Sequence, residues 1–385
     1  MKFTGYLRPD GKVGVRNYLA IIPTSVCAGV VASNIASQIP KAVALPNQHG
    51  CCQIGADHDQ TVNTLIGLGK NPNIGAVLVV GLGCEGVPIT KVAEEISKTG
   101  KTVEVVIIQE AGGTLKATAE GVQKASRIAR EISLIKPQEF PVSELSLAVE
   151  CGGSDFTSGL ASNPVVGIAS DILVKAGGTS ILSETTEFIG AEHILAKRGK
   201  STEVGEKIFK IVNDCEQKAK LLNVDIRGGQ PTPGNIQGGI SSIEEKSLGC
   251  IYKAGSAPIE GVLAYGEIPQ EKGLYVMDTP GQDIESITGM LAGGATVVIF
   301  TTGRGTPTGS PIAPVIKITA NADTYSMMSD NIDLDASDII QGVKSIEEVG
   351  QELFQEILDV ANGKLTKAES LGHHEFGIYK IAPTF

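Results

Sequence analysis

The chain has 385 residues, 42% of them hydrophobic, which predicts two or three domains with apolar cores of their own. Its net charge of -11 and its scattered lysines and arginines exclude an extended nucleic-acid surface. No apolar run reaches the ~18 residues of a membrane span, and no apolar signal segment opens the sequence, so the seven cysteines are expected to be reduced thiols in the cytoplasm.

Residues 1–138 alternate strand-like and helix-like segments. Buried-strand runs at 17–26, 41–50, 74–83 and 102–110 are each followed by a helical pattern, at 28–39, 58–70, 88–100 and 114–135. Four such repeats predict right-handed crossovers and a doubly wound parallel sheet. We therefore expect a Rossmann-like α/β domain over 1–138.

Residues 144–385 are predicted to form a second α/β domain. A charged segment with two prolines, 136–145, is expected to link it to the first. Strands are expected at 145–153 and 179–188, and helices at 164–178, 190–200, 201–224 and 345–364. The Pro- and Gly-rich stretch 227–239 is long and polar for a connector, so it is a candidate functional loop.

Four cysteines fall at predicted strand-to-helix turns: Cys27, Cys51, Cys84 and Cys151. Ligands of open α/β sheets bind outside the carboxyl ends of the strands. Thiolates from three separate turns can hold an iron–sulfur cluster with one open iron, or a single iron aided by oxygen or nitrogen donors. By position we expect Cys51, Cys84 and Cys151 to surround the metal, with Cys27 in reserve. The alternative is that each is a small apolar residue packed near a strand.

The turn after the third strand also fits a dinucleotide-binding pattern. Gly81, Gly83 and Gly86 follow a strand and precede a helix, as such a phosphate-binding turn requires. Cys84 and Glu85, however, place reactive groups where small residues would suit a pyrophosphate. A nucleotide-binding, non-catalytic subunit therefore stays as the alternative of a different class.

The stretch after Glu150 repeats the strand-then-glycine arrangement. Gly152 and Gly153 would free backbone N–H groups for a substrate carboxylate, with Ser154 beside them. Asp155 is either a proton acceptor or a helix cap.

Carboxylates and cations follow later strands. Glu184 and Glu187 could ligate a divalent metal or remove a proton, or could merely favour a helix N-terminus. Lys246 and Lys253 lie near flexible turns, and either would act as a general base if desolvated.

The segment 301–317 is the best candidate for binding an anion. Arg304, between two glycines, can present its planar guanidinium to a carboxylate or sulfonate. Thr302 and Thr306 add hydroxyl donors, and Lys317 is expected to supply a second positive charge.

Seven motifs taken together identify a resemblance: HGCCQIG, GLGCEG, ECGGSDFTSGLASNP, PTPGN, EKSLGC, KAGS and TTGRGTP. The chain resembles the altronate/galactarate dehydratase family, which includes the large subunit of sulfolactate sulfo-lyase. The resemblance runs over essentially the whole chain. Full-length members begin with a small SAF-type domain, so the resemblance implies the large subunit of a split enzyme whose small domain is a separate polypeptide.

The family implies iron-dependent β-elimination from a 2-hydroxy acid. Water would leave a sugar acid such as altronate or galactarate to give a 2-oxo-3-deoxy acid; in the sulfo-lyase, sulfite leaves and pyruvate forms. The iron would be Fe²⁺ or a [4Fe–4S] cluster with an open iron. Arg304 would hold a substrate anion, and the acid/base candidates are Glu85, Asp155, Glu184, Glu187 and Lys253.

Overall fold

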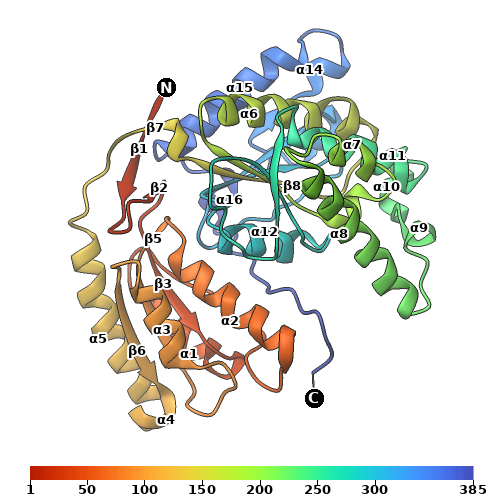
Figure 1. Cartoon of the computed structure of the whole chain (residues 1–385). Coiled ribbons are helices and arrows are strands. Elements are labelled where there is room, and N and C mark those ends of the chain that lie inside the picture. The colour runs from red at the N-terminus through yellow and green to blue at the C-terminus, as the bar shows by residue number, and fades with distance from the viewer. Residues whose placement is uncertain (385) are drawn as a thin grey trace.

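A computed structural model describes residues 1–384 and has two α/β domains, each with a parallel sheet (Figure 1). In the first domain, drawn red to orange, the strands lie in the order β4-β3-β5-β6, and neighbours are parallel. Their bounds are Ala42–Ala44 for β4, Tyr18–Pro23 for β3, Ile74–Gly81 for β5 and Thr102–Ile107 for β6. The predicted α/β class with a doubly wound sheet is confirmed.

Helices cover both faces of this sheet. One face shares an apolar core with α1 (Gly29–Ala36) and α5 (Thr114–Ile132), and the other shares one with α2 (Gly55–Lys70) and α3 (Ile89–Ser97). Every residue of β5 is buried. Its unbroken aliphatic run follows from this, because a parallel strand covered on both faces has no side that favours polar residues. The short α4 (Ile108–Ala111) follows β6.

The second domain contains a seven-stranded sheet in the order β10-β11-β9-β8-β12-β13-β14, again with parallel neighbours. The strands are β8 (Ser146–Cys151), β9 (Thr179–Leu182), β10 (Ile259–Leu263), β11 (Gly273–Met277), β12 (Val297–Thr301), β13 (Val315–Thr319) and β14 (Leu334–Asp335). Successive side chains of β8 alternate between two cores: Leu147 and Val149 enter the outer one, and Ala148 enters the one shared with the first domain.

Long helices cover the outer face of the second sheet. They are α6 (Asn163–Lys175), α8 (Thr202–Leu221) and α15 (Ile346–Ala361), with the short α7 (Glu192–Ala196) beside α8. The stretch 227–239, predicted as a loop, overlaps two short helices, α9 (Ile226–Gly229) and α10 (Pro233–Gln237). The remaining helices are α11 (Ile243–Cys250), α13 (Ala322–Met327), α14 (Ser337–Ile340) and α16 (Lys367–Leu371).

A small sheet joins the N-terminus to the segment between the domains. Strand β7 (Gln138–Pro141), inside the segment expected to be a linker, pairs antiparallel with β1 (Lys2–Leu7), which also pairs with β2 (Val13–Gly14). The connection between the domains is thereby hydrogen-bonded in place.

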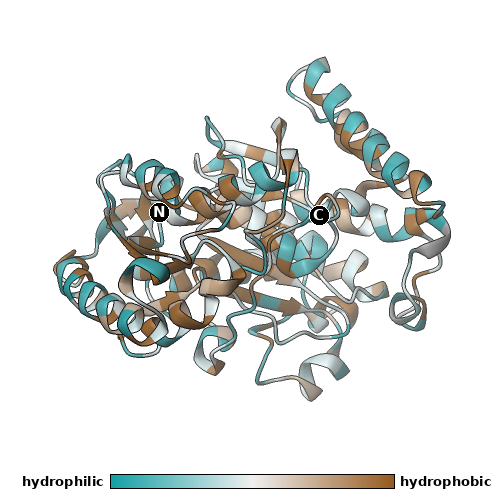
Figure 2. Cartoon of the chain, turned by 90° about the horizontal axis from the view of Figure 1, so that it is seen from below, coloured by the Kyte–Doolittle hydropathy of each residue, from teal (hydrophilic) through white to brown (hydrophobic). Residues whose placement is uncertain are grey.

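The two domains share one apolar core. It forms where α2 of the first domain packs against α12 (Asp283–Ala292) of the second. At this contact a Cβ on Gly67 would lie 2.6 Å from the carbonyl oxygen of Ala292, so only glycine allows the helices to approach this closely. Figure 2 shows the result: hydrophobic strands lie inside, and the outer helices carry hydrophilic residues.

In each sheet the chain continues to one side of the first strand and then switches to the other side, and this place is the switch point; in the second sheet β10 and β11 are also out of chain order. In the first sheet this switch point lies between β3 and β5, and in the second between β8 and β12. Crevices outside the carboxyl ends of the strands at such points are where open α/β sheets bind ligands.

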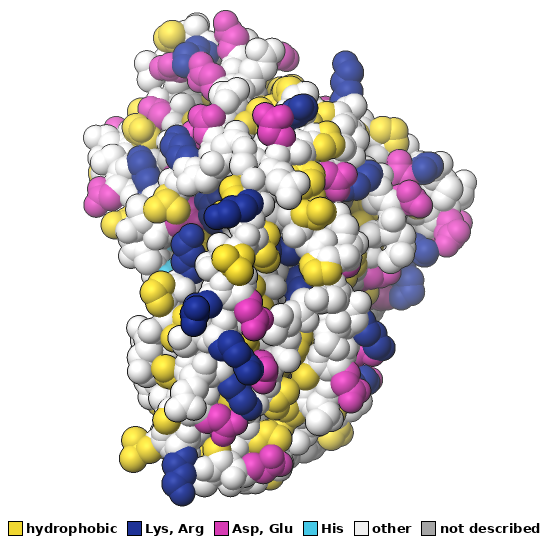
Figure 3. Space-filling view, turned by 90° about the vertical axis from the view of Figure 1, so that its left-hand side faces the viewer, with side chains coloured by type: hydrophobic (Ala, Val, Ile, Leu, Met, Phe, Trp, Pro, Cys, Tyr) yellow, Lys and Arg dark blue, Asp and Glu magenta, His cyan; other side chains and the backbone are white. Residues whose placement is uncertain are grey.

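The surface carries charges of both signs. On the face that Figure 3 shows, lysines and arginines are interspersed with aspartates and glutamates. Among the described residues, no helix combines the length and the apolar character needed to cross a membrane.

Candidate active site

A buried ion pair lies at the switch point of the second sheet. Glu184 follows β9, and Lys253 belongs to the 3₁₀ helix η5 (Ile251–Ala254). The Lys253 ammonium donates to Glu184 Oε2 at 2.6 Å, and both side chains are at most 1% exposed. The same oxygen accepts the backbone N–H of Cys151, at the end of β8 (3.0 Å). The sheet edge therefore brings together three of the predicted site residues.

The backbone of Glu184 is strained. Its φ of 69° lies in the left-handed region, where residues other than glycine are uncommon. A hydrogen bond from its N–H to Thr279 Oγ1 (2.7 Å) and the pair with Lys253 hold it there. Strain of this kind persists only where the surroundings determine the conformation, and it occurs most often at functional sites.

Two further carboxyl groups complete a group around Glu184. Single oxygens of Glu150, Glu184 and Asp283 lie within 4.8 Å of one another. Glu150 Oε2 accepts from the hydroxyls of Ser183 and Ser286, whereas Oε1 is buried with no donor. Burial and the charge of Glu184 raise the pKa of Glu150 well above its usual value, which favours the neutral form of this carboxyl group.

Asp283 is the accessible member of this group. It begins α12 and is only half-buried. Burial and the charge of Glu184 raise the pKa of Asp283 to about 7. A carboxyl group that titrates near neutrality and is partly accessible is suited to transferring a proton to or from a substrate.

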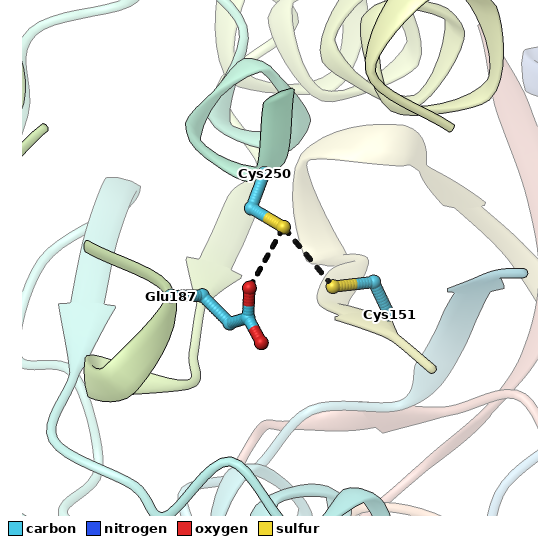
Figure 4. A group of neighbouring side chains, drawn as sticks. All are labelled: Cys151, Glu187 and Cys250. Atoms are coloured by element: carbon cyan, nitrogen blue, oxygen red, sulfur yellow. Dashed lines mark hydrogen bonds between the residues drawn. The ribbon is translucent and has the colours of Figure 1, made fainter. Parts of the chain in front are cut away.

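The two buried cysteines lie beside the ion pair. The sulfurs of Cys151 and Cys250 point toward each other, 3.5 Å apart, and Cys250 Sγ also contacts Glu187 Oε2 at 3.0 Å (Figure 4). Lys246 neutralises Glu187 at 2.6 Å and, although burial opposes ionisation, lowers its pKa. The hydrogen bond with Cys250, together with burial, raises the pKa of Cys151 well above its usual value. Although burial opposes ionisation, Lys246 and Lys253 thus each form an ion pair, which raises the pKa of both, so neither has the lowered pKa that a general base would need.

The glycines after β8 act differently from the prediction. The N–H of Gly152 donates to the carbonyl of Thr301 (3.0 Å) and is not free for a carboxylate. A Cβ on Gly152 would lie 2.5 Å from Asp283 Oδ2, so this glycine makes room for that side chain. The carbonyl of Gly153 accepts the N–H of Arg304 at 2.9 Å, which joins the two loops.

Asp155 takes the helix-cap role that the sequence left open. Its Oδ1 accepts the N–H groups of Thr157 and Ser158, and its Oδ2 accepts from the amide of Asn321. The carbonyl of the buried Ser154 accepts from Asn235 in α10. A π-helical turn at Ser158–Ser162 follows directly.

Arg304 is exposed and lines a cavity of about 480 Å³. Asp155, Gln237 and Asn321 also line it, and Asp155 further borders a narrow cavity of about 40 Å³ that reaches Lys246 and Cys250. The short helix α10, within the predicted functional loop, thus contributes to the cavity that contains the predicted anion-binding arginine.

The threonines and the lysine of the same segment are engaged elsewhere. Thr302 Oγ1 accepts the N–H of Gly305, and the hydroxyls of Thr306 and Thr308 bond to each other. Lys317 is fully buried and donates to the carbonyl of Thr308 at 3.0 Å. The prediction that Lys317 gives a substrate a second positive charge is therefore wrong; it ties its own loop to the sheet.

The glycine-rich turn of the first sheet is already filled by a carboxylate. Glu85 accepts the N–H groups of Leu82 (2.8 Å) and Gly83 (2.6 Å) and the hydroxyl of Thr24 (2.6 Å). Although burial opposes ionisation, these hydrogen bonds lower the pKa of Glu85. An ionised side chain thus occupies the amides that would bind a phosphate, so the geometry does not favour the nucleotide-binding alternative.

The predicted metal ligands come from both domains. Cys51 and Cys84 are exposed at the edge of the first sheet, and Cys151 is buried in the second domain. Among the described residues, two groups have ligand atoms within 4.8 Å of one another: Cys151 with Glu187 and Cys250, and Glu150 with Glu184 and Asp283. Cys51 and Cys84 are in neither group. One metal bound by all three predicted thiols stays a prediction.

Three residues of the site were not anticipated from the sequence. Asp283 follows β11 after a short loop, so the rule that located Glu184 would have found it. Glu150 is a buried residue within β8, one position before Cys151, and Cys250 lies in α11. No local sequence pattern therefore predicts that either belongs to the site.

The chain matches one family of known proteins over nearly its whole length. Residues 142–384 match the family model "D-galactarate/Altronate dehydratase, C-terminal", and residues 5–133 match "D-galactarate dehydratase/Altronate hydrolase, second domain". The chain is 38% identical to (2R)-sulfolactate sulfo-lyase subunit beta of Chromohalobacter salexigens, over 98% of this chain and 97% of that protein. It is 35% identical to altronate dehydratase of Bacillus subtilis and to galactarate dehydratase (L-threo-forming) of Escherichia coli, over 99% of this chain and 78% and 77% of theirs.

Proposed function

The chain belongs to the D-galactarate/altronate dehydratase family and is a lyase, and we propose that it is the large subunit of an enzyme that eliminates water from a sugar acid of the altronate or galactarate type. The product would be a 2-oxo-3-deoxy acid. The observation that supports this most directly is the buried Glu184–Lys253 pair beside Asp283, at the switch point of the second sheet.

The residues of the site divide the reaction between them. Asp283, with a pKa of about 7, accepts the proton from C2 of the substrate. The raised pKa of Glu150, which favours its neutral form, and the Lys253 ammonium keep the nearby negative charge low enough for an anionic substrate to approach. Arg304 binds a substrate carboxylate from the neighbouring cavity. Iron, when bound, supplies a Lewis acid for the 2-hydroxycarboxylate.

The two buried ligand groups are poor candidates for holding that iron. Each already contains a paired cation: Lys253 lies 2.6 Å from Glu184, and Lys246 lies 2.6 Å from Glu187. A second cation there would meet a buried ammonium group at short range. The exposed thiols Cys51 and Cys84 belong to neither of these groups, and we assign the iron to their side of the molecule.

A second candidate reaction is the release of sulfite from sulfolactate, with pyruvate as the other product. It is favoured by the match to the sulfo-lyase subunit, which runs over 97% of that protein. Because that relative is a beta subunit, we propose that this chain also works with a separate small subunit of the SAF type.

One assay separates these functions. The anaerobically purified chain, combined with its small partner and ferrous iron, is offered altronate, galactarate and sulfolactate in turn. A 2-oxo-3-deoxy acid supports the dehydratase, sulfite with pyruvate supports the sulfo-lyase, and turnover of none of the three contradicts the proposal. We expect little turnover by the chain alone.

A further inference from the structure

Four of the seven cysteines are exposed at one edge of the first sheet: Cys27, Cys51, Cys52 and Cys84. Cysteine is among the residues most often buried, and exposed thiols are prone to oxidation. Cys27 lies in η1 (Val26–Ala28) after β3, Cys51 and Cys52 follow β4, and Cys84 follows β5. All four therefore lie at the carboxyl ends of neighbouring strands, around the switch point between β3 and β5.

Hydrogen bonds hold these three turns against one another. The N–H of Val26, next to Cys27, donates to the carbonyl of His49 at 2.9 Å. The carbonyl of Gly50, next to Cys51, accepts the N–H of Gly86 at 3.0 Å, two residues beyond Cys84. The turn that carries Cys51 thus crosses the end of β3 and reaches the turn that carries Cys84.

The crossing requires a glycine. Gly50 has φ of +101°, and a Cβ there would lie 2.1 Å from the carbonyl oxygen of Thr24. Nearby, the hydroxyl of Ser25 is buried without a hydrogen-bond partner, and Cys84 Sγ accepts from the amide of Gln109 at 3.4 Å. N–H donors to thiolate sulfur are among the contacts that set the properties of iron–sulfur sites.

We propose that Cys27, Cys51 and Cys84 hold a [4Fe–4S] cluster through three thiolates and leave its fourth iron open. Thiolates are the ligands that such clusters prefer. A single tetrahedral metal would need sulfurs about 4 Å apart, and these three do not form a group within 4.8 Å among the described residues. A cluster accepts wider spacing, because each thiolate binds a different iron.

This ligand set excludes the thiols of the second domain. Cys151 is 3% exposed and pairs with Cys250, so it stays in the acid–base group. Cys52 shares a turn with Cys51, with its sulfur 4.0 Å from that of Cys51, and the proposed cluster takes one thiolate from each of the three turns. The use of the open iron rests on the proposed function, but the ligand assignment does not.

Cysteine-to-serine variants of the full chain test the assignment. Anaerobically purified protein should contain about four iron and four sulfide per chain, with a thiolate-to-iron absorption band. In Cys27→Ser, Cys51→Ser and Cys84→Ser, iron and sulfide should each fall to less than about a tenth, while circular dichroism shows the fold unchanged, since the three side chains are exposed.

The matched controls are Cys52→Ser, Cys151→Ser and Cys215→Ser, which should keep the cluster. Full iron and sulfide in any of the first three variants, or loss of both in a folded control, would overturn the assignment. Elimination by a protein that binds ferrous iron without sulfide would also overturn it while the proposed function stands. If the chain holds the cluster but, together with its partner, turns over none of the three acids, the ligand assignment stands and the proposed function is contradicted.

Discussion

At the scale of single residues, the site is an arrangement of buried charges. Glu184 and Lys253 pair in a nearly solvent-free position, and burial raises the pKa of the neighbouring Glu150. Burial, together with the charge of Glu184, therefore raises the proton affinity of the carboxyl groups of Glu150 and Asp283. This is why Asp283, the open member, titrates near neutrality.

Replacing Lys253 with methionine should destabilise the protein strongly. The substitution leaves the buried side chain of Glu184 without its ion-pair partner, which lowers the free energy of unfolding by about 3–5 kcal/mol. Denaturant titration measures this. The control is Lys200→Met, which breaks the solvent-exposed pair with Glu260 and should leave stability near that of the wild type. Equal effects of the two substitutions would show that the Lys253 pair is not desolvated.

Asp283→Asn should abolish the rise of kcat with pH that we expect below about pH 7. In the wild type, kcat should rise with pH and level off above about 7, as the base loses its proton. The variant should lose about 10²- to 10⁴-fold in kcat and show no such rise. If kcat of the variant still rises with pH below about 7, the rise belongs to another titratable group.

The same substitution should change stability in a pH-dependent way. The fold raises the pKa of Asp283 above its unfolded value, so the native state favours the protonated form, and stability falls as pH rises from about 4 toward 7. Asp283→Asn removes this loss. Its stability relative to the wild type should therefore increase from pH 4 to pH 8 in denaturant titrations.

At the scale of elements, the position of Lys253 depends on how closely α6 approaches η5. A Cβ on Gly167 of α6 would lie 2.3 Å from the carbonyl oxygen of Tyr252, the residue before Lys253. The helix and the turn that carries the lysine therefore pack backbone against backbone. The geometry of the ion pair is thus set by a helix that contributes no side chain to it.

Gly167→Ala should displace η5 and weaken both stability and turnover. Overpacking of this kind destabilises by about 1–3 kcal/mol, and it moves Lys253 away from Glu184. The matched control is Gly29→Ala at the start of α1, where a Cβ meets nothing within 4 Å and helical alanine should slightly stabilise. Thermal unfolding and kcat are measured for both. A Gly167→Ala protein as active and stable as the control would show that η5 can adjust.

At the scale of the whole molecule, the C-terminal segment connects the two domains, and Figure 1 shows it running between them. The carbonyl of Ile378 accepts from His49, that of Tyr379 accepts from Gln60, and the N–H of Ile381 donates to Asp57. Ile378 itself is fully buried in the shared core.

Removing residues 373–385 should loosen the contact between the domains. The truncation exposes the cavity left by Ile378 and breaks these hydrogen bonds, so the melting temperature should fall by roughly 5 °C or more. A control that ends after Ile381 keeps the contacts and should melt like the full chain. If both truncations behave alike, the segment adds little to the joining of the domains.

Some features were fixed by local patterns in the sequence. Unbroken aliphatic runs such as that of β5 predicted buried parallel strands, because a strand covered on both faces needs apolar residues throughout. Turns after such strands predicted where Cys84, Cys151 and Glu184 lie. The motifs shared with a known family predicted the class of reaction, since a site built from several turns keeps a recognisable set of residues.

Only the tertiary structure decided which of these residues meet. Cys250 and Lys253 reach β8 and β9 because α11 and η5 fold back over the sheet edge, a contact between residues some seventy to a hundred positions apart. Whether Lys317 holds a substrate or its own loop depended on carbonyls placed by the same folding. A sequence specifies which chemical groups are present and at which strand ends, but burial and distance, which set charge and proton affinity, arise only when distant segments pack together.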